Sequence, residues 1–138
     1  MDLIVREYND EDFEEVNKLL YETFNYSKAN IRNDMSHEFV GVYDSKIIGY
    51  FILNEMIDIV RNLKFYHLDY VCVDENYRGR GFAKSMMEYA IKYAKDTGAC
   101  RIDLTSGNKR IAAHKLYLGL GFVKRDTSVF RKEFSWWY

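Results

Sequence analysis

The feature that most constrains the fold is a long apolar segment followed by a glycine-rich turn and an amphipathic segment. Residues 65–73 alternate in character as a β-strand does. One expected face carries Tyr66, Leu68, Tyr70 and Cys72, and the other carries His67, Asp69, Val71 and Val73. Beyond the turn, a helical stripe consists of Phe82, Met86, Met87, Ala90, Ile91 and Ala94. A strand joined to a helix in this way predicts a helix packed against a sheet.

The remaining apolar patterns place this unit in a mixed α/β domain. Further strands are expected at 3–7, 39–43, 47–56, 101–105, 121–123 and 128–134, and helices at 13–24 and from 108 to about 118. Residues 26–35 are polar and irregular, and we expect a second short helix there. We therefore predict a single domain over residues 1–138. Its central sheet is expected to be mixed and mostly antiparallel, with about six or seven strands and about four flanking helices.

Composition narrows the classes of partner. The chain has 138 residues and a net charge of −1, so no overall basic field favours nucleic acid or an acidic membrane. Asp2, Arg6 and Glu7 interrupt any apolar leader, and no run has membrane-spanning length. These features predict a cytoplasmic protein. Cys72 and Cys100 both lie in apolar runs, which predicts two buried, reduced thiols and no metal site.

The glycine-rich turn has the composition of an anion-binding site. Gly79 and Gly81 let the backbone approach a ligand closely. The free amides of the first helical turn, together with the helix dipole, attract negative charge. Arg78 and Arg80 add positive charge, so the turn is suited to a pyrophosphate.

Two common glycine loops do not match this turn, and a third pattern does. Ala83 stands where a Walker loop needs Gly before Lys-Ser, and Lys84 stands where the dinucleotide fingerprint needs its third Gly. The pattern Arg-x-x-Gly-x-Gly/Ala is met by Arg78, Gly81 and Ala83. With the preceding Tyr77, it resembles the acetyl-CoA signature of the GNAT acetyltransferase superfamily.

A second segment strengthens the resemblance. Asn108, a helix with small residues, Tyr117 and the pair Gly121-Phe122 resemble the later motif of the same superfamily, in which Gly-Phe opens a strand. The order of elements also follows the family over nearly the whole chain. The resemblance is weakest at 26–35, where members differ and acceptors bind.

The resemblance implies acetyl-CoA as co-substrate and no metal. Backbone groups of Val71 and Val73 are expected to pair with the pantetheine arm as an added strand does. The amides from Arg78 to Ala83 are expected to hold the pyrophosphate. The full expected cofactor set is Val71, Cys72, Val73, Arg78, Gly79, Arg80, Gly81, Phe82, Ala83, Lys84, Asn108 and Tyr117. Asp74 stands where many members have Pro, which is a turn substitution.

The implied reaction is direct attack of an amine on the thioester in a ternary complex. Tyr117 matches the family tyrosine near the thioester sulfur and is the candidate acid for the leaving thiolate. Asp69 matches a position where some members place a Glu base, and its shorter side chain favours a water relay. Asp69 could equally position the substrate ammonium or pair with a cation, and His67, with a pKa suited to a base, could share the task.

The acceptor and the assembly are less constrained. The acidic first helix is suited either to a cationic acceptor amine or simply to solvent. The aromatic residues at 134–138 either cover the sheet or dock on a second subunit, and the frequency of dimers in the family favours a homodimer. The competing class is a non-catalytic acyl-CoA-binding sensor on the same fold.

Overall fold

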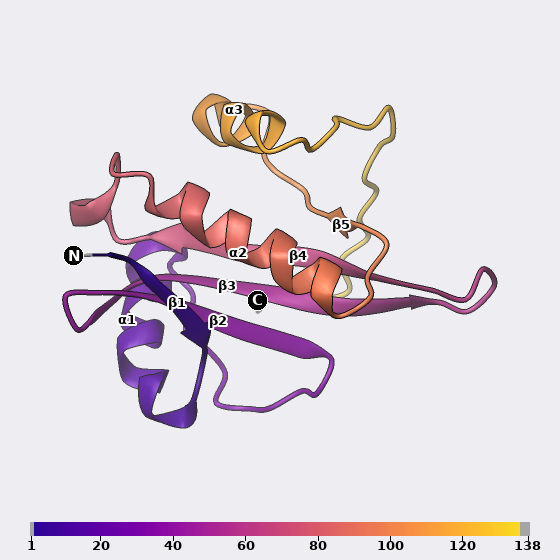
Figure 1. The fold of residues 1–138 in the computed structure, drawn as a ribbon. Coiled ribbons are helices and arrows are strands. Elements are labelled where there is room, and N and C mark those ends of the chain that lie inside the picture. The colour runs from indigo at the N-terminus through magenta and orange to yellow at the C-terminus, as the bar shows by residue number, and fades with distance from the viewer. Residues whose placement is uncertain (1, 136–138) are drawn as a thin grey trace. The chain divides into compact units, whose positions relative to one another are not determined.

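The computed structural model describes residues 2–135, which separate into two compact units, one ending at Thr105 and one starting at Ser106 (Figure 1). The single domain expected over residues 1–138 stays a prediction. Residues 136–138, most of the expected aromatic cluster, lie outside the described part of the chain. In residues 2–135, no helix is long and apolar enough to cross a membrane.

The first unit is built on one five-stranded sheet in the order β1-β2-β3-β4-β5. The strands are β1 (Ile4–Glu7), β2 (Ser36–Tyr43), β3 (Lys46–Asp58), β4 (Leu63–Val73) and β5 (Ile102–Asp103). Each neighbouring pair is antiparallel except β4 and β5, which are parallel and joined by α2 (Phe82–Asp96). The expected mixed, mostly antiparallel α/β class is confirmed. The described residues contain five strands and three α-helices, somewhat fewer than expected.

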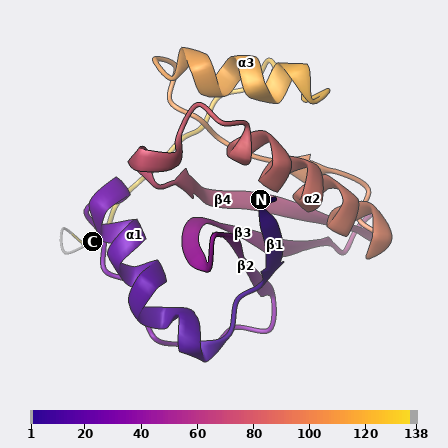
Figure 2. The ribbon, with the colours of Figure 1, turned by 60° about the vertical axis from the view of Figure 1, so that its left-hand side comes forward.

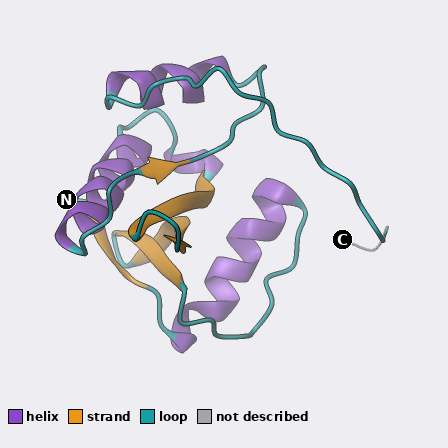
Figure 3. Ribbon diagram, turned by 90° about the vertical axis from the view of Figure 1, so that its right-hand side faces the viewer, coloured by secondary structure: helices purple, strands orange, loops and turns teal. Residues whose placement is uncertain are grey.

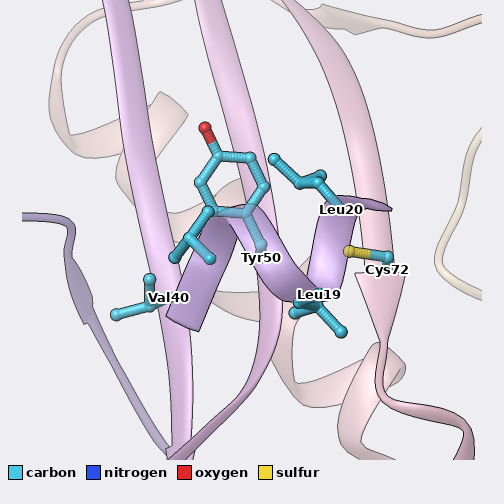
Figure 4. Close-up of a cluster of buried hydrophobic side chains, with 6 residues drawn as sticks. Leu19, Leu20, Val40, Tyr50 and Cys72 are labelled. Carbon is cyan, nitrogen blue, oxygen red and sulfur yellow. The ribbon is translucent and has the colours of Figure 1, made fainter. Parts of the chain in front are cut away.

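Two helices cover opposite faces of this sheet, as Figures 2 and 3 show. On one face, α1 (Phe13–Phe24) packs Leu19 and Leu20 against Val40, Tyr50 and Cys72 (Figure 4). All five residues are buried, so this cluster is one half of the core.

On the other face, α2 presents the stripe that its spacing predicted. Met86 and Met87 are buried, as are Ala90 and Ala94 on the next two turns. The helix lies so close to β3 that a Cβ at Gly49 would come within 2.4 Å of the Met86 sulfur. Glycine at this position therefore sets the distance between helix and sheet.

A bulge in β4 makes the expected face assignment wrong beyond Tyr70. The pairing of β3 with β4 shifts register between Tyr50 and Ile52, and Tyr70 has a φ of +53°. The bulge residue breaks the two-residue alternation, so the side chains beyond it change face. Cys72 therefore shares the α1 face with His67 and Asp69, whereas Tyr66 and Leu68 lie on the α2 face.

Several smaller expectations also need correction. Residues 26–35 form no helix, because Asn25 ends α1 in the left-handed region and the following polar residues bury no apolar stripe. Cys100 is exposed rather than buried, because it lies in the short connection between α2 and β5. Only Cys72 is a buried thiol.

The second unit contains α3 (Ile111–Gly119) and an extended tail. The helix ends in a Schellman motif, because the Phe122 amide bonds to the Tyr117 carbonyl at 3.0 Å and the Gly121 amide to the Leu118 carbonyl at 3.1 Å. Gly121 has a φ of +91°, and the rings of Tyr117 and Phe122 lie 5.9 Å apart. The pair Gly121-Phe122 thus closes a helix.

The strands expected at 121–123 and 128–134 are absent from the described residues. A strand needs hydrogen bonds to a neighbour, and residues 123–135 make no backbone ladder in the described structure. Exposed residues also dominate this segment, so no buried face sets a register.

Candidate functional site

The glycine-rich turn joins the end of β4 to the start of α2. Asp74 caps the short 3₁₀ turn that follows it, and Arg78 Nε donates to the Val73 carbonyl at 3.0 Å. Gly79 and Gly81 have φ values of +77° and +80°. A Cβ is strained in that region, so this path of the backbone requires glycine at both positions.

The first turn of α2 offers unpaired amides. Gly81 is the N-cap, and no described side chain caps this end of the helix. The amides of Phe82, Ala83 and Lys84 therefore have no intrahelical partner, and they lie at the positive end of the helix dipole. A Cβ built on Gly79 or Gly81 would meet no atom within 4 Å, so the space in front of the turn is open.

The other predicted residues of the turn contribute differently. The Arg80 guanidinium lies 5.2 Å from the centre of the Tyr77 ring, which holds a positive charge over the turn. Phe82 packs against Tyr43, with ring centroids 4.9 Å apart, and so anchors the first turn of α2 to the sheet. Lys84 is exposed and free to meet an anion.

The edge of β4 next to the turn is open. In residues 2–105, β5 pairs with β4 only at Tyr66 and His67. The Asp74 amide donates to β3 at 2.7 Å, and backbone groups alternate in direction along a strand. The backbone groups of Val71 and Val73 therefore point to the open edge, which is where an added strand would pair. The Val73 carbonyl already accepts a hydrogen bond from Arg78 there, so the N–H and C=O of Val71 and the N–H of Val73 are the groups left for such a strand.

Cys72 differs from its neighbours, because its side chain lies in the core with Leu19, Leu20 and Tyr50 (Figure 4). Burial raises the pKa of its thiol to about 12. The same alternation points the N–H and C=O of Cys72 toward β3, so neither its side chain nor its backbone faces the open edge of β4.

The two candidate bases on β4 are brought together. His67 Nδ1 lies 3.0 Å from Asp69 Oδ2, and each side chain is about one-third exposed. Asn54 Nδ2 donates to the same Asp69 oxygen at 2.6 Å, and Ser36 Oγ donates to Asn54 Oδ1 at 2.6 Å. The result is a polar network of four side chains from three adjacent strands: Ser36, Asn54, Asp69 and His67.

Sequence reasoning missed two members of this network. Asn54 carried a signal, because it is an amide near the end of an otherwise apolar strand segment. Ser36 carried none, because it lies beside an irregular segment and its partner is 18 residues away. Only the sheet register reveals that Ser36, Asn54 and His67 lie side by side.

A second polar group on the α1 face was also missed. Lys28 Nζ lies 2.8 Å from Glu38 Oε1 and 4.6 Å from the centre of the Tyr8 ring, although its side chain is only 9% exposed. Tyr50 donates a hydrogen bond to the same Glu38 oxygen, and burial raises the pKa of that phenol. These contacts tie residues 26–35 to the sheet.

A cavity of about 500 Å³ lies between residues 30–34 and the strands β1 and β2. Its charged lining is mostly acidic and consists of Glu7, Asp10, Asp34 and Glu38 together with Arg32. Ser36 lines the same cavity, so the polar network begins at its wall.

The remaining predicted residues, Asn108 and Tyr117, belong to the second unit. Asn108 is exposed in a turn closed by a 3.0 Å hydrogen bond from the Arg110 amide to the Gly107 carbonyl. Tyr117 is 8% exposed, and burial raises the pKa of its phenol. The phenol is therefore protonated at neutral pH and has a proton to donate, and the raised pKa makes it a weaker acid than an exposed tyrosine.

The open β4 edge, the glycine turn and the uncapped helix follow one another directly along residues 71–84 of the first unit. The model of the acetyltransferase (GNAT) family matches residues 1–122, and the chain belongs to this family. The ribosomal-protein-alanine N-acetyltransferase of Brucella melitensis biovar Abortus 2308 has the same fold. Its TM-score is 0.83 at 18% identity, over 97% of this chain and 100% of that chain.

Curated relatives match a shorter part of the chain. Human N-acetyltransferase 8B is 34% identical over 70 residues, which are 51% of this chain and 30% of that protein. N-acetylaspartate synthetase of Xenopus tropicalis is 35% identical over 85 residues, which are 60% of this chain and 29% of that protein. The chain thus spans less than one-third of the length of either relative.

Proposed function

We propose that this protein transfers an acetyl group from acetyl-CoA to a primary amine of a small molecule or peptide, by direct attack in a ternary complex. The observation that carries the proposal is the open edge of β4 leading directly into an uncapped, glycine-flanked helix N-terminus. Membership of the acetyltransferase (GNAT) family supports it. The names of the two curated relatives, both describing N-acetylation, also support it.

The residues of the first unit fit the chemistry of acetyl-CoA. The N–H and C=O of Val71 and the N–H of Val73 point outward and are suited to the amides of a pantetheine arm. The first-turn amides of α2, with Arg78 and Arg80 beside them, are suited to a pyrophosphate. The thioester supplies an activated acetyl group whose leaving group is a stabilised thiolate.

The base in this proposal is the pair of His67 and Asp69. An alkylammonium has a pKa of about 10.4, so it must lose a proton before it can attack a carbonyl. The hydrogen bond between Nδ1 and Asp69 leaves His67 Nε2 as the free ring nitrogen. We assign proton removal to Nε2 and the holding of the imidazole to Asp69, which revises the expectation that Asp69 itself is the base.

We assign the donation of a proton to the departing thiolate to Tyr117. Its buried phenol holds its proton at neutral pH. Asn108 is assigned a contact with the cofactor by its side chain, on the strength of its position in the family motif. The acidic lining of the cavity favours an acceptor that carries an ammonium group.

The decisive experiment is to incubate the purified protein with acetyl-CoA and a panel of polyamines, amino acids, aminoglycosides and peptides. Mass spectrometry should detect an acetylated amine in proportion to the free CoA formed. Acetyl-CoA affinity should be measured on the same preparation by isothermal titration calorimetry. Tight binding with no transfer to any amine would favour the sensor instead, and absence of binding would contradict both functions.

A further inference from the structure

In the polar network of Ser36, Asn54, Asp69 and His67, each hydrogen bond has a defined donor and acceptor. We propose that Asn54, held by Ser36, is a positioning residue that fixes Asp69 and thereby the tautomer of His67. The catalytic part of this inference rests on the proposed acetyl transfer. The structural part concerns only which ring nitrogen of His67 carries the proton.

The sheet register builds the network from residues far apart in sequence. Ser36 pairs with Asn54 across β2 and β3, and Asn54 pairs with His67 across β3 and β4. The three residues therefore form one row across the sheet with their side chains on the same face. Asp69 is two residues beyond His67 on β4, before the bulge, and so also lies on this face.

The donors and acceptors allow only one direction along this row. Asn54 Nδ2 must point to the carboxylate, because Oδ1 in its place would set two acceptors 2.6 Å apart. Oδ1 then faces Ser36, which must donate its hydroxyl proton at 2.6 Å. Asp69 Oδ2 thus accepts one hydrogen bond from Asn54 Nδ2 and a second from His67 Nδ1. The hydrogen bond from Asn54 favours the orientation in which Asp69 Oδ2 faces the imidazole.

The consequence is a His67 whose Nε2 lone pair is free in the neutral form. Imidazole in water favours the opposite tautomer, with the proton on Nε2, so the network must act to keep Nε2 unprotonated. An acceptor ammonium transfers one proton to Nε2, which yields a free amine and an imidazolium. Asp69 then stabilises that imidazolium through the bond to Nδ1.

The test measures the tautomer directly and uses turnover as a second readout. Nitrogen-15 NMR of the full chain distinguishes protonated from unprotonated ring nitrogens at a pH where the histidines are neutral. The chain has three histidines, and the signals of His67 are identified by their loss in His67→Gln. The wild-type protein should show the proton on Nδ1 and an unprotonated Nε2.

The variants remove one hydrogen bond at a time. Asn54→Leu keeps the approximate volume and removes both bonds of the amide, so His67 should shift toward the Nε2–H form. Because the lost hydrogen bond is to a charged group, kcat should fall about tenfold or more. The acetyl-CoA Kd should remain within about twofold, because none of the four side chains of the network belongs to residues 71–84.

Ser36→Ala and Ser36→Thr form the matched pair and keep the test valid if Asn54→Leu folds poorly. The alanine should shift the tautomer in the same direction, and the threonine, which keeps a hydroxyl, should restore the wild-type spectrum. A wild-type His67 protonated on Nε2, or variants with an unchanged tautomer, would overturn the inference whether or not the protein transfers acetyl groups. If the variants keep both the wild-type tautomer and the wild-type turnover, the positioning role of Asn54 is refuted and the acetyl transfer stands. If the wild type and the variants show the expected tautomers but the wild type transfers no acetyl group, only the proposed acetyl transfer is refuted.

Discussion

The glycine turn and the polar network are built in opposite ways. The turn lies within residues 71–84 and offers backbone groups, so its chemistry depends on where glycine allows the chain to go. The network takes four side chains from β2, β3 and β4, between Ser36 and Asp69. A site built from backbone groups can be predicted from a short sequence motif. A site built from side chains on several strands can be identified only once the register of those strands is known.

If the two regions act separately, a change in one should leave the other intact. The largest effect is expected from His67→Gln, which removes the titratable nitrogen and keeps a polar side chain. The kcat should fall about 10³-fold, because a positioned base contributes about 10²–10⁴-fold. Steady-state kinetics with the best acceptor, together with calorimetric acetyl-CoA binding, would check this.

The matched control for that substitution is His114→Gln, in the second unit. It should retain kcat within about twofold, and both variants should bind acetyl-CoA as the wild type does. A large loss of acetyl-CoA affinity in His67→Gln would break the separation between the two regions.

The reciprocal test is Gly81→Glu. A side chain with a φ of +80° is strained, and the carboxylate repels an anion at the helix N-terminus. Together these effects should raise the acetyl-CoA Kd about 10²-fold. Isothermal titration of acetyl-CoA measures the change.

Gly98→Glu is a close control for backbone strain. Gly98 has a φ of +84°, and a Cβ there also meets nothing within 4 Å, but it lies beyond the other end of α2. Comparable loss of affinity in both variants would attribute the effect to strain and leave the glycine turn without a role in binding.

The same contrast explains how much the sequence could predict. Helix α2 and the strand before it were predicted because an apolar stripe and a two-residue alternation depend on nearby residues alone. The bulge at Tyr70 could not be predicted in this way, because it arises from a shift in register between β3 and β4 that the sequence of β4 alone does not reveal. The side-chain face of Cys72 was therefore assigned wrongly, although the strand itself was found.

The motif around Gly121 shows a different limit. The sequence pattern predicts that the pair Gly121-Phe122 starts a strand, and the structure shows instead that the pair ends a helix. Glycine followed by an apolar residue is equally the signature of a Schellman helix end, in which Phe122 packs back on Tyr117. The same two residues fit a strand start and a helix end, and only the backbone hydrogen bonds of the structure distinguish the two.

A smaller effect is expected from Tyr117→Phe. An ordinary thiol has a pKa of about 8.5, so the thiolate of CoA is a stable leaving group that needs little help from an acid near neutral pH. The loss in kcat should therefore be about tenfold, and it should shrink at higher pH, where the thiolate needs no proton. The pH profile of kcat for the variant and the wild type measures this difference. A loss that is the same at every pH would remove Tyr117 from the role of acid and leave it a packing residue.

The smallest effect is expected at Cys72, inside the expected cofactor set. Its thiol lies in the α1 core, so Cys72→Ala should leave the acetyl-CoA Kd within about twofold and reduce stability by about 1 kcal/mol. Burial raises the thiol pKa to about 12, so the group stays neutral at pH 8 and its alkylation should remain slow there. The exposed Cys100 should react first, and mass spectrometry after iodoacetamide treatment should show one modified thiol in the folded protein. Rapid modification of both thiols would mean that the Cys72 thiol is not buried. A large loss of affinity in Cys72→Ala would mean that a side chain contributes to the donor site. In that case the acetyl-CoA site would not be built from backbone groups alone, and Cys72 would be the side chain that it uses.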